Sequence, residues 1–119
     1  MNYSEITLDQ LFDSLREASL MEFNARGMEG LPAQARAVDL LDTIQTEIAR
    51  RPESVDRYRE MLKDPHPCFR LSAAYGLKKA DPAAAAATFK ELSKSNSEGG
   101  IPSKALLEVF AFRKMGYSV

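Results

Sequence analysis

The stretch that decides the fold is Leu62-Lys-Asp-Pro-His-Pro-Cys-Phe-Arg-Leu-Ser-Ala-Ala-Tyr-Gly-Leu77. Its Asp-Pro-His-Pro segment, residues 64–67, stops one helix because proline lacks a backbone donor and disfavours the α-conformation in the residue before it. Pro67 then suits the first turn of a new helix, expected over residues 67–79. The apolar residues of this helix recur at helical spacing. Its expected buried residues are Phe69, Ala73, Ala74, Leu77 and Ala80.

The same helical spacing continues in both directions from this stretch, and no run alternates apolar and polar residues as a strand does. Thr7 with Gln10 forms a capping-box pattern, Gly27 suits the left-handed residue after a helix, and Asp81 suits a helix N-cap. The chain is therefore predicted to be all-α. Six helices are expected, at about residues 8–26, 32–50, 53–63 and 67–79, from Pro82 past Leu92, and from Pro102 to near Gly116.

Composition and charge limit the classes of protein that the chain can belong to. The 119 residues, 45% hydrophobic and 28% charged, predict one folded domain over residues 1–119. The 16 basic and 17 acidic residues nearly cancel, so no nucleic-acid partner is expected. The single cysteine, Cys68, excludes an internal disulfide, and neither a signal peptide nor a membrane span is recognisable. A cytoplasmic protein without membrane contact is expected.

Six helices with short connections suggest three antiparallel helix hairpins, an arrangement in which each hairpin can be one unit of an internal repeat. A spacing of 33 residues places Ala37, Arg70 and Ser103 in equivalent positions. A spacing of 34 residues matches charges better but loses the apolar correspondence, and burial contributes more than a surface charge match. The 33-residue spacing predicts that three groups are buried: Leu40, Leu41 and Ile44; Ala73, Ala74 and Leu77; Leu106, Leu107 and Phe110.

The stretch from Leu62 to Leu77 resembles a HEAT repeat, in which an Asp-Pro turn is followed by an arginine, paired alanines and a leucine. The resemblance implies a short right-handed HEAT-like superhelix of three hairpins. It also implies that Asp64 and Arg70 belong to a charge ladder between repeats. The whole chain resembles small bacterial HEAT-like or armadillo-like proteins of families without a known function, so the resemblance implies a fold and no activity.

Groups that could carry chemistry are few. His66 and Cys68 lie two residues apart, but a zinc site needs three or four protein ligands and the chain has one His and one Cys. Asp39 and Asp42 are better explained as solvated helix charges than as an acid–base or cation pair. No catalytic residue, metal or cofactor is therefore expected, and the protein is expected not to be an enzyme.

In a HEAT-like stack the second helix of each hairpin lines a concave face, and this face is the predicted site for an unidentified protein partner. The leading hypothesis is a noncatalytic protein–protein interaction module, one version of which is an immunity protein. The alternatives are a small-ligand-binding protein or enzyme with a pocket between helices, and self-association into a homodimer. The candidate protein-binding residues are Asp39, Asp42, Ser72, Tyr75, Lys79, Glu108 and Phe112, with Phe112 expected to pack more than to bind and Tyr75 evenly balanced.

Overall fold

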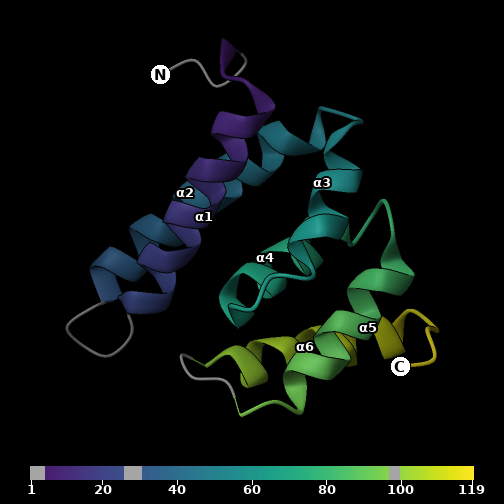
Figure 1. Cartoon of the computed structure of the whole chain (residues 1–119). Coiled ribbons are helices and arrows are strands. Elements are labelled where there is room, and N and C mark those ends of the chain that lie inside the picture. The colour runs from purple at the N-terminus through teal and green to yellow at the C-terminus, as the bar shows by residue number, and fades with distance from the viewer. Residues whose placement is uncertain (1–4, 26–30, 97–99) are drawn as a thin grey trace. The chain divides into compact units, whose positions relative to one another are not determined.

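The computed structural model describes residues 5–25, 31–96 and 100–119, and over these ranges it contains six α-helices and no strand (Figure 1). The predicted all-α class and the arrangement of helices in hairpins are confirmed. Each helix begins within one residue of its predicted start. The helices are α1 (Leu8–Asn24), α2 (Leu31–Ala49), α3 (Ser54–Met61), α4 (Pro67–Leu77), α5 (Pro82–Ser93) and α6 (Ile101–Lys114).

Three helix starts are held by side-chain caps. The Thr7 hydroxyl accepts a hydrogen bond from the Gln10 backbone, and the Gln10 side chain accepts one from the Thr7 backbone, so the predicted capping box is present. Asp81 caps α5 as predicted, by accepting from the N–H of Ala84. His66 caps α4 through its Nδ1 atom, a role that the sequence did not suggest. Gly27 lies outside the described residues.

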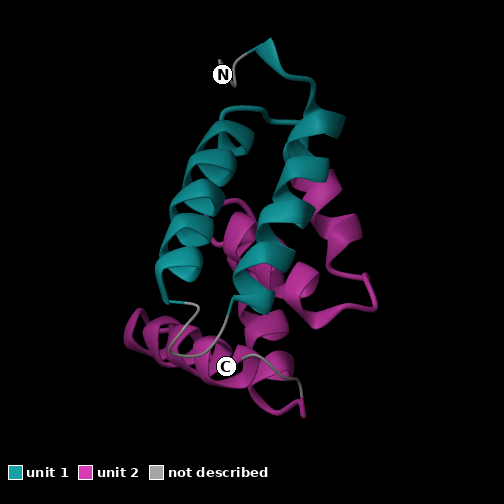
Figure 2. Cartoon of the chain, turned by 90° about the vertical axis from the view of Figure 1, so that its left-hand side faces the viewer, with its two compact units in different colours: residues 1–54 teal, residues 55–119 magenta. Residues whose placement is uncertain are grey.

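The chain divides into two compact units, unit 1 (residues 1–54) and unit 2 (residues 55–119), coloured separately in Figure 2. In unit 1, α1 and α2 lie side by side as a hairpin. Its buried apolar residues include Leu11, Phe12 and Leu15 of α1 and Ile44 and Ile48 of α2, as their helical spacing predicts. Both helices therefore turn their apolar stripes inward.

Unit 2 contains α3 from Val55 onward together with α4, α5 and α6. The fifth helix packs against both α4 and α6, so it is the central helix of this unit. Its small residues Ala85 and Ala86 are buried and allow close approach, while Phe89 and Leu92 fill the interior. The alanines near the start of α5 thus serve packing in this unit.

The buried face of α6 differs from the face that the 33-residue spacing predicts. Leu106, Leu107 and Phe110 are exposed at 40%, 67% and 51%, so the prediction that they are buried is wrong. The rejected 34-residue spacing instead equates Ala37, Leu71 and Ala105, and all three are buried. Apolar residues occupy two opposite sides of α6, and contact with α5 decides which side is inside. The residues of α6 that are buried are Ile101, Ala105, Val109 and Phe112.

A smaller correction concerns Ala80, which was predicted to be buried in the fourth helix. Ala80 is exposed because α4 ends at Leu77 and Ala80 lies in the turn that follows it. Three other residues are half-buried although their helical spacing predicts full burial, namely Leu40, Leu41 and Phe69. In each case helical spacing alone overestimated the depth of burial.

A glycine closes the C-terminal end of α6. Gly116 has a φ of 96°, a conformation that favours glycine, and its N–H donates to the carbonyl of Arg113. The N–H of Tyr117 donates to the carbonyl of Phe112, and the two rings meet edge to face with centroids 5.2 Å apart. These two hydrogen bonds and the ring contact form a Schellman motif, which fixes the end of the helix.

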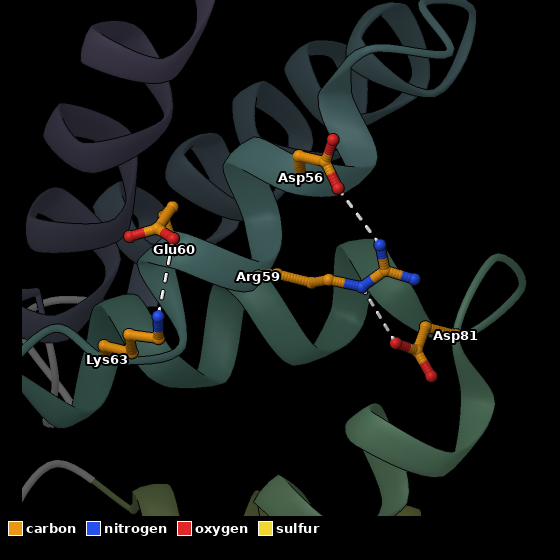
Figure 3. A network of polar contacts seen from close by, with 5 residues as sticks. All are labelled: Asp56, Arg59, Glu60, Lys63 and Asp81. Carbon is orange, nitrogen blue, oxygen red and sulfur yellow. Dashed lines mark hydrogen bonds and ion pairs between the residues drawn. The ribbon is translucent and has the colours of Figure 1, made fainter.

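A charged network joins α3 to the start of α5 (Figure 3). The Arg59 guanidinium lies between two carboxylates, with Nη1 3.1 Å from Asp56 Oδ1 and Nε 3.1 Å from Asp81 Oδ2. The N–H of Ala84, followed by the guanidinium of Arg59, lowers the pKa of Asp81 below its ordinary value of 3.8. Asp81 therefore contributes stability mainly when it is ionised.

We expect Asp81→Asn to remove part of the acid dependence of stability. A carboxylate with a lowered pKa stabilises the fold above its unfolded-state pKa, near 3.8, and this contribution is lost as pH falls through the lowered value. Thermal melts from about pH 5 to about pH 2 should show a shallower decline for the variant, whose amide oxygen can still cap α5. Asp81→Ala, which also loses the cap, should be less stable than Asp81→Asn across the whole range. Equal slopes for wild type and Asp81→Asn would contradict the assignment.

Candidate functional site

The structure separates the seven candidate residues predicted from the sequence. The two on α2 belong to unit 1 and the other five belong to unit 2. Two of the seven, Ser72 and Phe112, are buried at 7% and 1% exposure, so their predicted place on an open surface is wrong. Asp39, Asp42 and Lys79 are exposed, whereas Tyr75 and Glu108 are half-buried.

Phe112 belongs to a row of aromatic rings inside unit 2. Its ring centroid lies 6.1 Å from that of Phe89, and the Phe89 centroid lies 5.2 Å from that of Tyr75 in an edge-on contact. The burial of Phe112 agrees with the expectation that this residue packs against its neighbours. Tyr75 contributes one side of its ring to the same packing, and the Lys78 Nζ atom lies 5.8 Å from its centroid. Phe89 and Phe112 are thus part of the core, and the half-buried Tyr75 packs at its edge.

Glu108 is turned toward α4 by an ion pair. Its Oε1 atom lies 2.6 Å from the Lys78 Nζ atom, and its side chain is 19% exposed. A half-buried pair of this kind draws the carboxylate away from the outer side of α6. Glu108 therefore links α6 to α4 and leaves the opposite side of α6 without an acidic residue.

The charge pairing implied by the HEAT resemblance takes a different form. Asp64 accepts a hydrogen bond from the backbone N–H of His66, so it braces its own turn. The Arg70 Nη1 atom lies 2.7 Å from Glu91 Oε1, which ties α4 to α5. Each residue has a local role within unit 2.

His66 and Cys68 lie together at the start of α4. The Nδ1 atom of His66 accepts from the N–H of Cys68 at 3.1 Å, and Cys68 is buried. Their proximity follows from helix capping. Over the described residues, no group of three or more His, Cys, Asp or Glu side chains is arranged to hold a metal ion.

The main surface feature that the sequence analysis missed is the side of α6 that points away from α5. We call it the α6 outer face and define it as Ser103, Leu106, Leu107, Phe110, Arg113 and Lys114, all of which are exposed. Successive members are one or three residues apart, and at this spacing they share one side of the helix. Its apolar centre consists of the three residues that the 33-residue spacing had placed in the core. The sequence does contain a sign of this face, because α6 has apolar residues on two sides. Helices that pack against one side of α6 leave the other side exposed.

The two units also differ in charge, which the near-neutral total conceals. Residues 1–54 carry ten acidic and five basic side chains, whereas residues 55–119 carry seven acidic and eleven basic ones. The α6 outer face therefore belongs to a unit with a net positive charge. A partner that approaches this unit gains from negative charge.

Comparisons with models of protein families, with curated proteins and with solved structures found no match. Among the described residues, no helix has both the length and the apolar composition needed to cross a bilayer.

Proposed function

We propose that the protein is a noncatalytic protein-binding module and that its binding surface is the α6 outer face. The observation that carries this proposal is the exposure of Leu106, Leu107 and Phe110 beside one another on a helix whose opposite side is already buried. The proposal keeps the function predicted from the sequence and moves the site. Phe112 and Ser72 leave the site because they are buried in unit 2.

Physical chemistry supports this choice of surface. Single exposed apolar residues are common, but adjacent ones form a patch that contributes about 25 cal/mol for each Å² of apolar surface removed from water. Leu107 and Phe110 are three residues apart, and both side chains are more than half exposed. Large apolar side chains at this spacing are typical of surfaces that receive an amphipathic partner helix.

We also propose that the hairpins belong to a HEAT-like architecture, as the Leu62–Leu77 stretch suggests. An immunity protein, which neutralises a toxin by binding to it, is one role that such a module can perform. The exposed apolar centre of α6 is consistent with that role because a tight inhibitor needs buried apolar anchors.

The proposal is tested by affinity capture from an extract of the source cells, with the tagged wild type compared with Leu107→Asp. We expect a protein partner that the wild type enriches and that Leu107→Asp loses, because a carboxylate in the buried centre of an interface is costly to desolvate. Val38→Asp is the matched control, since Val38 is an apolar residue of α2 with 46% exposure. Circular dichroism should show the same helix content for all three proteins. If the wild type enriches no protein over the tag alone, the protein-binding proposal is wrong.

A further inference from the structure

The α6 outer face combines its apolar centre with positive charge at the C-terminal end of the helix. The Arg113 guanidinium lies 5.8 Å from the centroid of the Phe110 ring, and the Arg113 Nε atom donates to the backbone oxygen of Val119 at 2.9 Å. Lys114 is exposed beside it. These contacts hold the Arg113 guanidinium beside the Phe110 ring, so a partner on this face would contact the positive charge and the apolar centre together.

No acidic side chain balances these cations on α6. Glu108 is the single acidic residue in the helix, and it is turned toward Lys78 on the opposite side. The remaining residues of the outer face are neutral or basic. The surface is therefore apolar in its middle and positive at its C-terminal end. No acidic side chain of the same face offsets the charge of Arg113 and Lys114.

We propose that the α6 outer face binds an acidic amphipathic helix of another protein. This inference rests on the proposed function and names the chemistry of its partner. The partner helix places apolar residues over Leu106, Leu107 and Phe110, and Asp or Glu side chains opposite Arg113 and Lys114. At 14 residues α6 is about 21 Å long, which matches three to four turns of a partner helix.

A second copy of this chain fits the surface less well. In a two-fold dimer each α6 outer face meets its own copy, because such an interface is self-complementary. If the two helices ran parallel, the Arg113 and Lys114 ends would lie together and repel each other. If they ran antiparallel, those ends would face the first turn of the other helix, which contains Lys104 and no acidic residue. The charge pattern thus favours a different, acidic partner.

Anionic lipid and nucleic acid also fit the surface less well. Binding to an anionic membrane relies on a cluster of several basic residues, so the two cations of this face supply little attraction to a bilayer. Nucleic acid would leave Leu106 and Leu107 without apolar contacts, because phosphates meet charged and polar groups. An acidic amphipathic helix satisfies both halves of the surface at once.

The test is a selection from a display library of about 18-residue helical peptides against the full chain, in which charged positions vary between Asp, Glu, Lys and Arg. We expect the enriched peptides to be acidic and to repeat apolar residues at three- and four-residue spacing. Leu107→Asp should raise the Kd of the best peptide at least about tenfold, whereas Val38→Asp should leave it unchanged. Raising the salt from about 0.1 M to about 1 M should weaken binding, since screening shortens the reach of charge from about 10 Å to about 3 Å.

A charge reversal gives the sharpest readout. Lys114→Glu should weaken the selected acidic peptide and should strengthen a version of that peptide with each Glu replaced by Lys. Enriched peptides that are neutral or basic, or that bind Leu107→Asp as well as wild type, would overturn the inference, as would the absence of enriched peptides. A dimer in size-exclusion chromatography that Leu107→Asp dissociates would assign the face to a second copy of the chain instead. Sedimentation with phosphatidylserine vesicles that Leu107→Asp abolishes would assign it to lipid. If capture from cell extract succeeds but proves insensitive to Leu107→Asp, the protein-binding function stands and this assignment of the surface fails.

Discussion

Phe112→Ala is expected to lower the free energy of unfolding by about 3–5 kcal/mol, the usual cost of truncating a buried phenylalanine. Phe112 is 1% exposed and packs between Phe89 and Tyr117. Its removal leaves a cavity in unit 2 and takes away the ring contact that accompanies the Schellman motif at the end of α6. Because the chain has no Trp, urea denaturation followed by far-UV circular dichroism is the suitable measurement.

Phe110→Ala is the matched control for this prediction. Phe110 lies two residues earlier on the same helix, but its side chain is 51% exposed, so its truncation should change stability by no more than about 0.5 kcal/mol. The comparison tests which side of α6 is buried. If Phe110→Ala proves the more destabilising variant, the 33-residue repeat spacing is correct and the described burial of α6 is wrong.

The second large effect is expected at Gly76, where α4 meets α3. A Cβ atom at this position would lie 2.2 Å from Cζ and 2.3 Å from Cε1 of the Tyr58 ring, far inside van der Waals contact. Tyr58 is 3% exposed, so its ring has little room to move. We expect Gly76→Ala to destabilise the protein by about 2 kcal/mol through overpacking. The sign is informative, because alanine at an unhindered helix position would stabilise by up to about 1 kcal/mol.

A double-mutant cycle with Tyr58→Ala isolates this contact. Without the ring, the added methyl group has space, and the Gly76→Ala change should become neutral or stabilising. Urea denaturation of the four proteins, namely wild type, each single variant and the double variant, supplies the coupling free energy. A Gly76→Ala protein as stable as wild type, or additive effects in the cycle, would show that Tyr58 does not pack against Gly76.

Helix starts could be predicted well from the sequence because their signals are local. The Thr7–Gln10 capping box and the Asp81-Pro82 pair each bond to backbone groups within three residues, so no distant contact is needed to place them. Helix ends were less predictable. The ends of α1, α3 and α4 each lie two residues before their predicted positions, because the last turn of a helix has weaker side-chain signals. The end of α6 was predicted better, because Gly116 marks it in the sequence.

The candidate site could be predicted from the sequence only in part. The acidic residues Asp39 and Asp42 were placed correctly on the exposed side of α2. For α6 the wrong side of the helix was predicted to be buried. Glu108 and Phe112 were expected to face outward, and they face α4 and α5 instead. Ser72 was assigned to the outer side of its helix by the 33-residue spacing, yet this polar residue is buried. Polarity indicates exposure only on average, since small hydroxyl groups are readily buried when they find hydrogen bonds.

The sequence by itself determined that the described residues are all-α and where each of their helices begins, because helical periodicity, caps and prolines act over three or four residues. Only the tertiary structure decided which side of α6 is buried. Ile101, Ala105, Val109 and Phe112 form one apolar side, and Leu106, Leu107 and Phe110 form another, so amphipathicity leaves two choices. The Lys78–Glu108 ion pair and the Phe89–Phe112 contact select one of them. Residues far apart in the chain make both interactions, and for that reason the exposed face proposed here for partner binding emerges only from the packed structure.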